Sequence, residues 1–275
     1  MTTVSTEGLA ERLLPSVLAA GALELRHYHS GVAVETKSDE SPVTIADREA
    51  EAVLLEALAR LAPGIPVVAE EAWSAGTATR TGGTFFLVDP LDGTREFIER
   101  RKEFTVNVAL VEAGVPTFGI IYAAAIGLLA ATFGPSDARE ATVVAATSGA
   151  TTGAIEWRRL ATRTPDLHRL TAVASRSHLN RETADLLARY RVASTRNAGS
   201  SLKFCLVARG EADVYPRLGP TREWDIAAGH AILAAAGGSV TTVDGAPLRY
   251  GKADAGYLNP SFIAWGRGYL APPAA

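Results

Sequence analysis

The chain has 275 residues, which is long enough for two domains with sizeable hydrophobic cores. Its hydrophobic fraction is 47%, its charged fraction 21% and its mean hydropathy +0.10, values typical of a folded globular protein. The net charge of −3 argues against a basic nucleic-acid-binding surface. A single cysteine, Cys205, excludes an intrachain disulfide and a cysteine metal cluster.

No apolar run in the sequence reaches membrane-spanning length. The first residues also lack the basic stretch and apolar core of a signal peptide. We therefore expect a cytoplasmic enzyme or binding protein.

Hydrophobic periodicity predicts helices and an antiparallel meander in the first half of the chain. Apolar residues at helical spacing predict a helix over residues 6–29, with Pro15 either kinking it or marking its start. A second helix is expected to begin at Thr44, with Asp47 completing a capping box, and to end near Leu61. Strands are predicted at 31–37, 65–69, 84–88, 104–111, 117–122, 128–133 and 141–145.

The second half alternates strands with helices, which is typical of an α/β layer. We therefore predict two domains, an α+β domain at residues 1–150 and an α/β domain at 151–275. Residues 72–83, expected to be a surface loop, and residues 135–169 carry no motif that indicates a role. Strands are predicted at 170–174, 191–195, 212–215, 239–243 and 261–265, and helices at 181–190, 197–208 and 224–236.

Two carboxylates follow the buried strand predicted at 84–88. Asp89 lies at its carboxyl end, and the turn that Pro90 and Gly93 enforce brings Asp92 back beside it. Two carboxylates this close repel each other unless a cation lies between them, and rigidly held oxygen ligands suit Mg²⁺. A solvated Asp-Gly turn is the alternative, and the two dipeptides alone do not decide between them.

Further acids also lie where an element ends or begins. Glu70 follows the strand predicted at 65–69, and Asp225 begins the helix predicted at 224–236. If the strands that precede Glu70 and Asp89 are neighbours, their acids meet at one edge of the sheet, as a multi-metal phosphoryl-transfer site requires. Acids at strand ends are common, so spacing alone leaves a structural role open.

A family resemblance decides between these alternatives. DPLDGT at residues 89–94, Glu70–Glu71 and WDIAAG at 224–229 resemble the signatures of the lithium-sensitive, Mg²⁺-dependent phosphatase superfamily that includes the inositol monophosphatases. From about residue 37 onward the chain resembles the bacterial 3'(2'),5'-bisphosphate nucleotidases of that superfamily. Phe86 and Ile226 depart from the usual tryptophan and threonine. The narrower resemblance is carried by residues 37–47, 103–107, 175–178, 199–208 and 215–220.

The resemblance implies a layered αβαβα fold and a site for two or three Mg²⁺ ions. Glu70, Asp89 and the Leu91 carbonyl would bind the first ion. Asp89, Asp92 and Asp225 would bind the second, and a third would lie by Glu70. The catalytic pair would be Thr94 and Asp47, which together orient and deprotonate a metal-activated water.

For the substrate, the resemblance implies adenosine 3',5'-bisphosphate, hydrolysed to AMP and phosphate as part of sulfur assimilation. Lys203 and Arg217 suit a second phosphate, although a lone lysine or histidine without the motif is more often structural. Inositol monophosphatase, fructose-1,6-bisphosphatase and a non-catalytic binding protein of this fold are the alternatives. The partner is thus a phosphorylated small molecule, and a homodimer stays open. The expected substrate-binding residues are Gly93, Thr94, His178, Ser200, Lys203 and Arg217.

Overall fold

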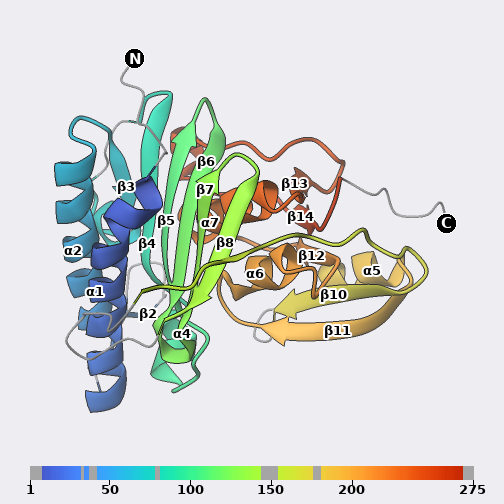
Figure 1. Ribbon diagram of the computed structural model, residues 1–275, viewed down its shortest axis with the longest axis horizontal. Coiled ribbons are helices and arrows are strands. Elements are labelled where there is room, and N and C mark those ends of the chain that lie inside the picture. The colour runs from blue at the N-terminus through green and yellow to red at the C-terminus, as the bar shows by residue number, and fades with distance from the viewer. Residues whose placement is uncertain are drawn as a thin grey trace.

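A computed structural model describes residues 8–31, 34–36, 42–77, 81–143, 154–175 and 181–268. The fold is a layered αβαβα sandwich, as expected (Figure 1). Within these residues no helix combines the length and apolar character needed to cross a membrane.

The larger sheet contains seven strands within the described residues. Its order is β3-β4-β5-β6-β7-β8-β9, with β3 and β4 parallel and the other pairs antiparallel. Adjacent strands joined by tight turns form the meander predicted from the sequence. The strands are β3 (Val67–Ala69), β4 (Thr84–Asp92), β5 (Thr105–Glu112), β6 (Val115–Ala123), β7 (Leu128–Gly134), β8 (Asp137–Thr142) and β9 (Arg158–Arg159).

Two long helices cover one face of this sheet. They are α1 (Leu9–Ser30) and α2 (Ile45–Leu61), with the short antiparallel pair β1 (Val34–Thr36) and β2 (Pro42–Thr44) between them in the chain. Apolar side chains of both helices pack on alternate residues of the strands, and Figure 1 shows the helices side by side on this face. Pro15 lies inside α1, so it does not mark the start of the helix.

The opposite face packs against two helices, which separate it from a second sheet. They are α6 (Leu202–Ala208) and α7 (Glu223–Ala235). Most residues of α7 are buried, so the helix has apolar side chains on all of its faces. The second sheet has the order β11-β10-β12-β14-β13 in the described residues. Its strands are β10 (Leu170–Ser175), β11 (Val192–Ala198), β12 (Val214–Arg217), β13 (Ser239–Thr242) and β14 (Phe262–Trp265), and α5 (Arg181–Ala188) covers its outer face.

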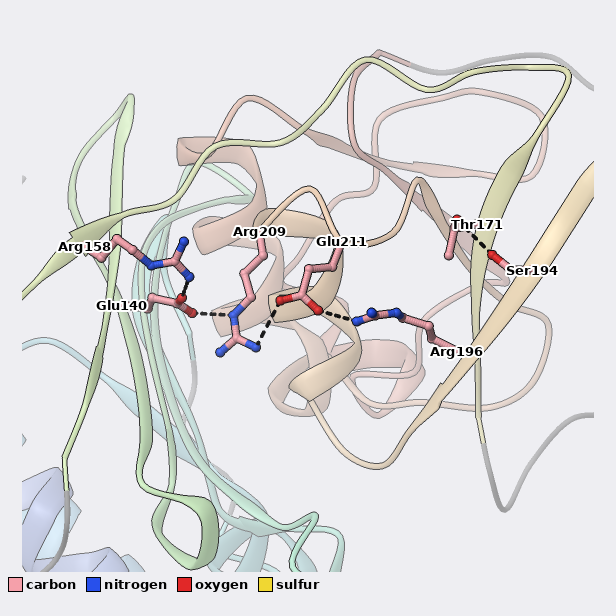
Figure 2. Close-up of polar contacts among 7 residues, drawn as sticks. All are labelled: Glu140, Arg158, Thr171, Ser194, Arg196, Arg209 and Glu211. Atoms are coloured by element: carbon pink, nitrogen blue, oxygen red, sulfur yellow. Dashed lines mark hydrogen bonds and ion pairs between the residues drawn. The ribbon is translucent and has the colours of Figure 1, made fainter.

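A chain of ion pairs joins the two sheets beside α6. Figure 2 shows Glu140 of β8 between Arg158 and Arg209, and Glu211 between Arg209 and Arg196 of β11. Glu140 is buried, with its carboxylate 2.5 Å from Arg209 Nε. Because breaking a buried pair leaves an uncompensated charge, these contacts oppose separation of the sheets.

Most predicted elements are confirmed, and three predictions are wrong. The helix predicted at 197–208 begins only at Leu202, because β11 continues through Ala198 in parallel pairing with β10. The stretch 72–83 is not entirely loop, because α3 (Glu70–Ser74) extends into it and α2 stabilises its start. The strand expected at 141–145 lies at Asp137–Thr142, where it pairs with β7. The division at residue 150 stays a prediction; β9 joins the larger sheet beyond that point.

The contact between α7 and β6 generates a stability prediction. A Cβ added at Gly119 of β6 would lie 2.3 Å from the Ala228 carbonyl oxygen, which is backbone and cannot turn away. We expect Gly119→Ala to lower the free energy of unfolding by about 1–3 kcal/mol and the melting temperature by roughly 2–10 °C. Thermal unfolding measures this change. Gly82→Ala is the control because no atom of the described residues lies within 4 Å of its added Cβ, and equal effects of both substitutions would contradict the packing argument.

Candidate active site

A buried carboxylate at the start of α2 contacts the predicted catalytic hydroxyl. Asp47 is 2% exposed, and its Oδ2 accepts hydrogen bonds from Thr44 N (2.8 Å) and Thr44 Oγ1 (2.7 Å), completing the predicted capping box. Its Oδ1 lies 3.2 Å from Thr94 Oγ1, which is also 3.2 Å from the Leu91 carbonyl. The capping box thus fixes the carboxylate, and the carboxylate orients Thr94.

Parallel pairing of β3 with β4 places two further acids at one edge of the sheet. Ala69 pairs with Val88, so Glu70 and Asp89 leave neighbouring strands at the same level. From the sequence, these acids were expected to meet only if their strands were neighbours. The parallel pairing shows that β3 and β4 are neighbours. Asp89 is 1% exposed and accepts a 3.1 Å hydrogen bond from Leu91 N.

An irregularity in β4 brings Asp92 to the same edge. Its pairing with β5 shifts between Asp89 and Asp92, which stands opposite Thr105. Gly93 follows with φ +95°, and its added Cβ would lie 3.0 Å from the Glu103 carbonyl oxygen, so only glycine fits. The short helix α4 (Thr94–Ile98) begins directly after this turn.

Ser200, from the second half of the chain, holds Asp92 by a hydrogen bond from its side chain. Its Oγ donates to Asp92 Oδ2 at 2.5 Å and lies 2.5 Å from Thr105 Oγ1, while its carbonyl accepts from Lys203 Nζ at 2.5 Å. Ser200 has φ +51°, an uncommon conformation for a residue with a side chain. The strained backbone is thus held by three polar contacts that face the site.

Asp225 reaches the site from the first turn of α7. Its Oδ2 accepts a 2.8 Å hydrogen bond from Arg222 N, while its carbonyl accepts from Ser201 Oγ at 2.8 Å. Burial raises its pKa well above the usual range for aspartate, and the nearby charges of Asp92 and Glu70 raise it further. Ionisation of Asp225 is therefore costly, first because of burial and second because Asp92 and Glu70 repel its charge.

A cavity of about 280 Å³ joins the acids to basic residues. Burial also raises the pKa of Asp92, which Lys203 partly offsets, whereas burial lowers the pKa of Lys203 to about 8. Asp47, Asp89 and Leu91 are buried and are not among the residues that line the cavity. The predicted residues that line the cavity are Glu70, Asp92, Gly93, Thr94, Ser200, Lys203, Arg217 and Asp225.

The cavity includes residues to which the sequence assigned no role, and one predicted substrate-binding residue cannot be placed. His178 lies outside the described residues. Arg95 and Glu96 line the cavity although the sequence analysis assigned them no role. Their position directly after Thr94, at the start of a helix, was the available signal. Tyr215 also lines the cavity; it begins the stretch 215–220 that carries the family resemblance, and that stretch was the available signal.

The donor set fits Mg²⁺. Glu70, Asp92 and Asp225 supply carboxylate oxygens, the ligands that Mg²⁺ prefers, and their mutual repulsion falls when a cation binds. Across the described part of the chain, no three acidic, histidine or cysteine side chains form a ready-made metal cluster.

Comparison with known proteins places this chain in a family. The model of the inositol monophosphatase family matches residues 9–266. The chain belongs to the inositol monophosphatase family. It is 42% identical over 230 residues to the 3'(2'),5'-bisphosphate nucleotidase CysQ of Shigella flexneri, covering 83% of this chain and 87% of the relative. It is 35% identical over 259 residues to CysQ of Buchnera aphidicola subsp. Acyrthosiphon pisum, covering 93% of each.

Solved structures of this family share the fold. The crystal structure of CysQ from Bacteroides thetaiotaomicron matches with a TM-score of 0.77 and 38% identity, over 96% of this chain and 98% of that one. The IMPase of Thermotoga maritima matches with a TM-score of 0.73 at 24% identity, over 94% and 92%. The resemblance to bacterial bisphosphate nucleotidases predicted from the sequence is confirmed.

The raised pKa of Asp225 predicts an opposite effect of one substitution with and without Mg²⁺. Since the folded state favours the protonated acid, the free energy of unfolding falls as pH rises from the usual aspartate pKa through the raised one. Asp225→Asn keeps an oxygen for the Arg222 amide but removes the charge. Without Mg²⁺, we expect it to raise the melting temperature above neutral pH by roughly 2–4 °C, with less effect at acidic pH.

Thermal unfolding with and without Mg²⁺ measures both effects. Mg²⁺ should stabilise the wild type more than Asp225→Asn, because the substitution removes an anionic ligand. A destabilised Asp225→Asn protein without Mg²⁺ would show that the carboxylate is not repelled in the folded state.

Proposed function

We propose that this protein is a Mg²⁺-dependent phosphatase that hydrolyses adenosine 3',5'-bisphosphate to AMP and phosphate. The observation that carries the proposal is the cavity, which has carboxylates on one wall and Lys203 and Arg217 on another. The 35–42% identity of this chain to proteins named CysQ supports the nucleotide substrate. From the same likeness, we propose that the reaction serves sulfur assimilation in the cytoplasm.

The carboxylates would hold the metal ions. Glu70, Asp89 and the Leu91 carbonyl would hold one Mg²⁺, and Asp89, Asp92 and Asp225 a second, with a third by Glu70. Bound Mg²⁺ supplies Lewis acidity towards the phosphoryl oxygens and lowers the pKa of water.

Thr94 and Asp47 would move the proton of the attacking water. The Thr94 hydroxyl lies on the cavity wall, with the Asp47 carboxylate behind it at 3.2 Å. A hydroxyl is a weak base alone, so Thr94 would pass its own proton to Asp47 Oδ1 as it accepts one from water. Because Thr44 holds Asp47 Oδ2, only Oδ1 faces Thr94.

Arg217 and Lys203 would bind the phosphate that is not cleaved. Arg217 Nη2 donates to the Pro220 carbonyl at 3.2 Å, which orients the guanidinium, while its Nε is a buried donor without an acceptor in the described residues. A phosphate oxygen would satisfy that donor. Lys203 lies beside Asp92 and would thus place its charge between the cleaved and the uncleaved phosphates. Gly93, Ser200 and His178 stay proposed substrate-binding residues.

Phosphate release with Mg²⁺ over a panel of phosphomonoesters tests the proposal. We expect kcat/KM for adenosine 3',5'-bisphosphate to exceed the values for inositol 1-phosphate and fructose 1,6-bisphosphate by at least tenfold, roughly the worth of one charge-assisted contact. Asp92→Asn is the control for contaminating phosphatases and should abolish the release. A preference for inositol 1-phosphate or fructose 1,6-bisphosphate would assign the protein that phosphatase activity instead of nucleotide hydrolysis. No hydrolysis of any substrate would favour a non-catalytic binding protein.

Arg217→Ala tests the source of that preference. Loss of a charge-assisted contact should lower kcat/KM for adenosine 3',5'-bisphosphate roughly ten- to a hundredfold, with little change for inositol 1-phosphate, which has no second phosphate. Arg217→Lys is the matched variant and should recover only part of the loss, because lysine lacks the planar fork. Equal losses on both substrates would assign Arg217 to the fold or to the shared acidic wall.

A further inference from the structure

The helix that begins with Glu70 is too short to hold its own position. α3 has five residues, and isolated helices of this length are unstable in water. Its start is fixed by the buried Glu51 of α2, which accepts hydrogen bonds from Glu71 N at 2.8 Å and Ala72 N at 2.9 Å. These bonds fix α3 to α2, but they do not fix it to α7, which carries Asp225.

Contact with α7 comes from Trp73, one turn after Glu70 on the same helix. The guanidinium carbon of Arg222 lies 4.1 Å from the centroid of the Trp73 ring, within the range of a cation–π interaction. The Trp224 ring lies 5.4 Å from the Trp73 ring at an angle of 53°. The side chain of the residue that caps α7 thus packs directly on α3.

Gly256 holds the other side of this stack. Arg222 Nη1 donates to the Gly256 carbonyl, and a Cβ added at Gly256 would lie 3.2 Å from Nη1 and 3.4 Å from the Trp73 ring. Arg222 and Trp73 are only half-buried, yet each is confined by a neighbour on a second side. The arrangement therefore restricts both side chains to one relative position.

Arg222 contacts both helices that carry these acids, α3 with Glu70 and α7 with Asp225. Its backbone N–H donates to Asp225 Oδ2 at 2.8 Å, and its side chain stacks on Trp73, three residues after Glu70. We propose that Arg222 and Trp73 are positioning residues, a clamp that sets the separation of Glu70 and Asp225 for cation binding. This inference rests on the proposed function, because it assumes that these two acids bind Mg²⁺.

The clamp opposes the electrostatic repulsion between Glu70 and Asp225. Glu70 and Asp225 repel each other across the cavity, so a loosely held α3 would move away from α7. Mg²⁺ requires near-ideal octahedral geometry, and a displaced carboxylate would have to return at a cost in binding free energy. Neither Arg222 nor Trp73 needs to touch the ion to have this effect.

Calorimetric titration of the metal-free protein with Mg²⁺ tests the clamp. Arg222→Ala keeps the backbone amide that contacts Asp225, and we expect it to raise the Kd for Mg²⁺ about three- to thirtyfold, the range expected for a cation–π contact. Trp73→Ala should raise the Kd similarly, and the double variant no more than either single one, since the two act as a unit. Because the acids remain, activity lost at low Mg²⁺ should recover at high Mg²⁺.

Arg139→Ala is the matched control. Arg139 lies 4.4 Å from the centroid of the Phe133 ring, on β7 and β8 and away from the cavity lining. Its loss should leave the Mg²⁺ Kd unchanged. Arg222→Lys and Trp73→Phe should recover part of the affinity, and they decide the question if an alanine variant fails to fold.

The outcomes separate the clamp from the activity. A wild type that binds Mg²⁺ without hydrolysing the phosphomonoesters would overturn the proposed function, while a raised Kd in the variants would still support the clamp. Variants that lose thermal stability but keep the wild-type Kd would overturn the clamp and leave the function intact. A wild type that binds no Mg²⁺ would overturn both, and additive effects of the two single substitutions would exclude a paired action.

Discussion

Repulsion among half-buried carboxylates is the constraint on which this site depends. Asp92 and Asp225 are costly to ionise because burial removes water and because each lies near the other and near Glu70. Lys203 offsets part of this charge, but it is itself buried and its pKa falls to about 8, so it is an incomplete counter-ion. An arrangement of this kind loses stability without a cation and gains it when one binds, which couples the fold to its ligand.

Backbone N–H groups hold two of the acids without neutralising them. Asp47 and Asp225 occupy the same position in α2 and α7, three residues after the cap, and each accepts a 2.8 Å hydrogen bond from the cap amide. The helix N-terminus also carries partial positive charge, which favours an anion there. The same local device therefore aims one carboxylate at Thr94 and the other into the cavity, from helices on opposite faces of the larger sheet.

The parts of the site that depend on local geometry could be predicted from the sequence. Thr44 and Asp47 have the spacing of a capping box, and the strand before Asp89 is a continuous apolar run. The turn at Gly93 follows from its need for positive φ. Each of these features involves residues close together in the chain, so the pattern contains the interaction. The parallel pairing of β3 and β4 could not be predicted from the sequence, because the register between separate strands is set by packing.

Contacts between distant segments could not be read from the sequence in the same way. Trp73 falls in a stretch of small and polar residues that favoured a loop, whereas the Glu51 carboxylate, about twenty residues earlier, holds the first turn of α3. Ser200 was expected to face substrate, yet its hydroxyl contacts Asp92, more than a hundred residues away in the chain. In both cases a segment that looks independent in the sequence is held by an acid from a distant part of the chain. In the proposed function the motif residues carry the chemistry, and in the proposed clamp Arg222 and Trp73, outside those motifs, set the separation of Glu70 and Asp225.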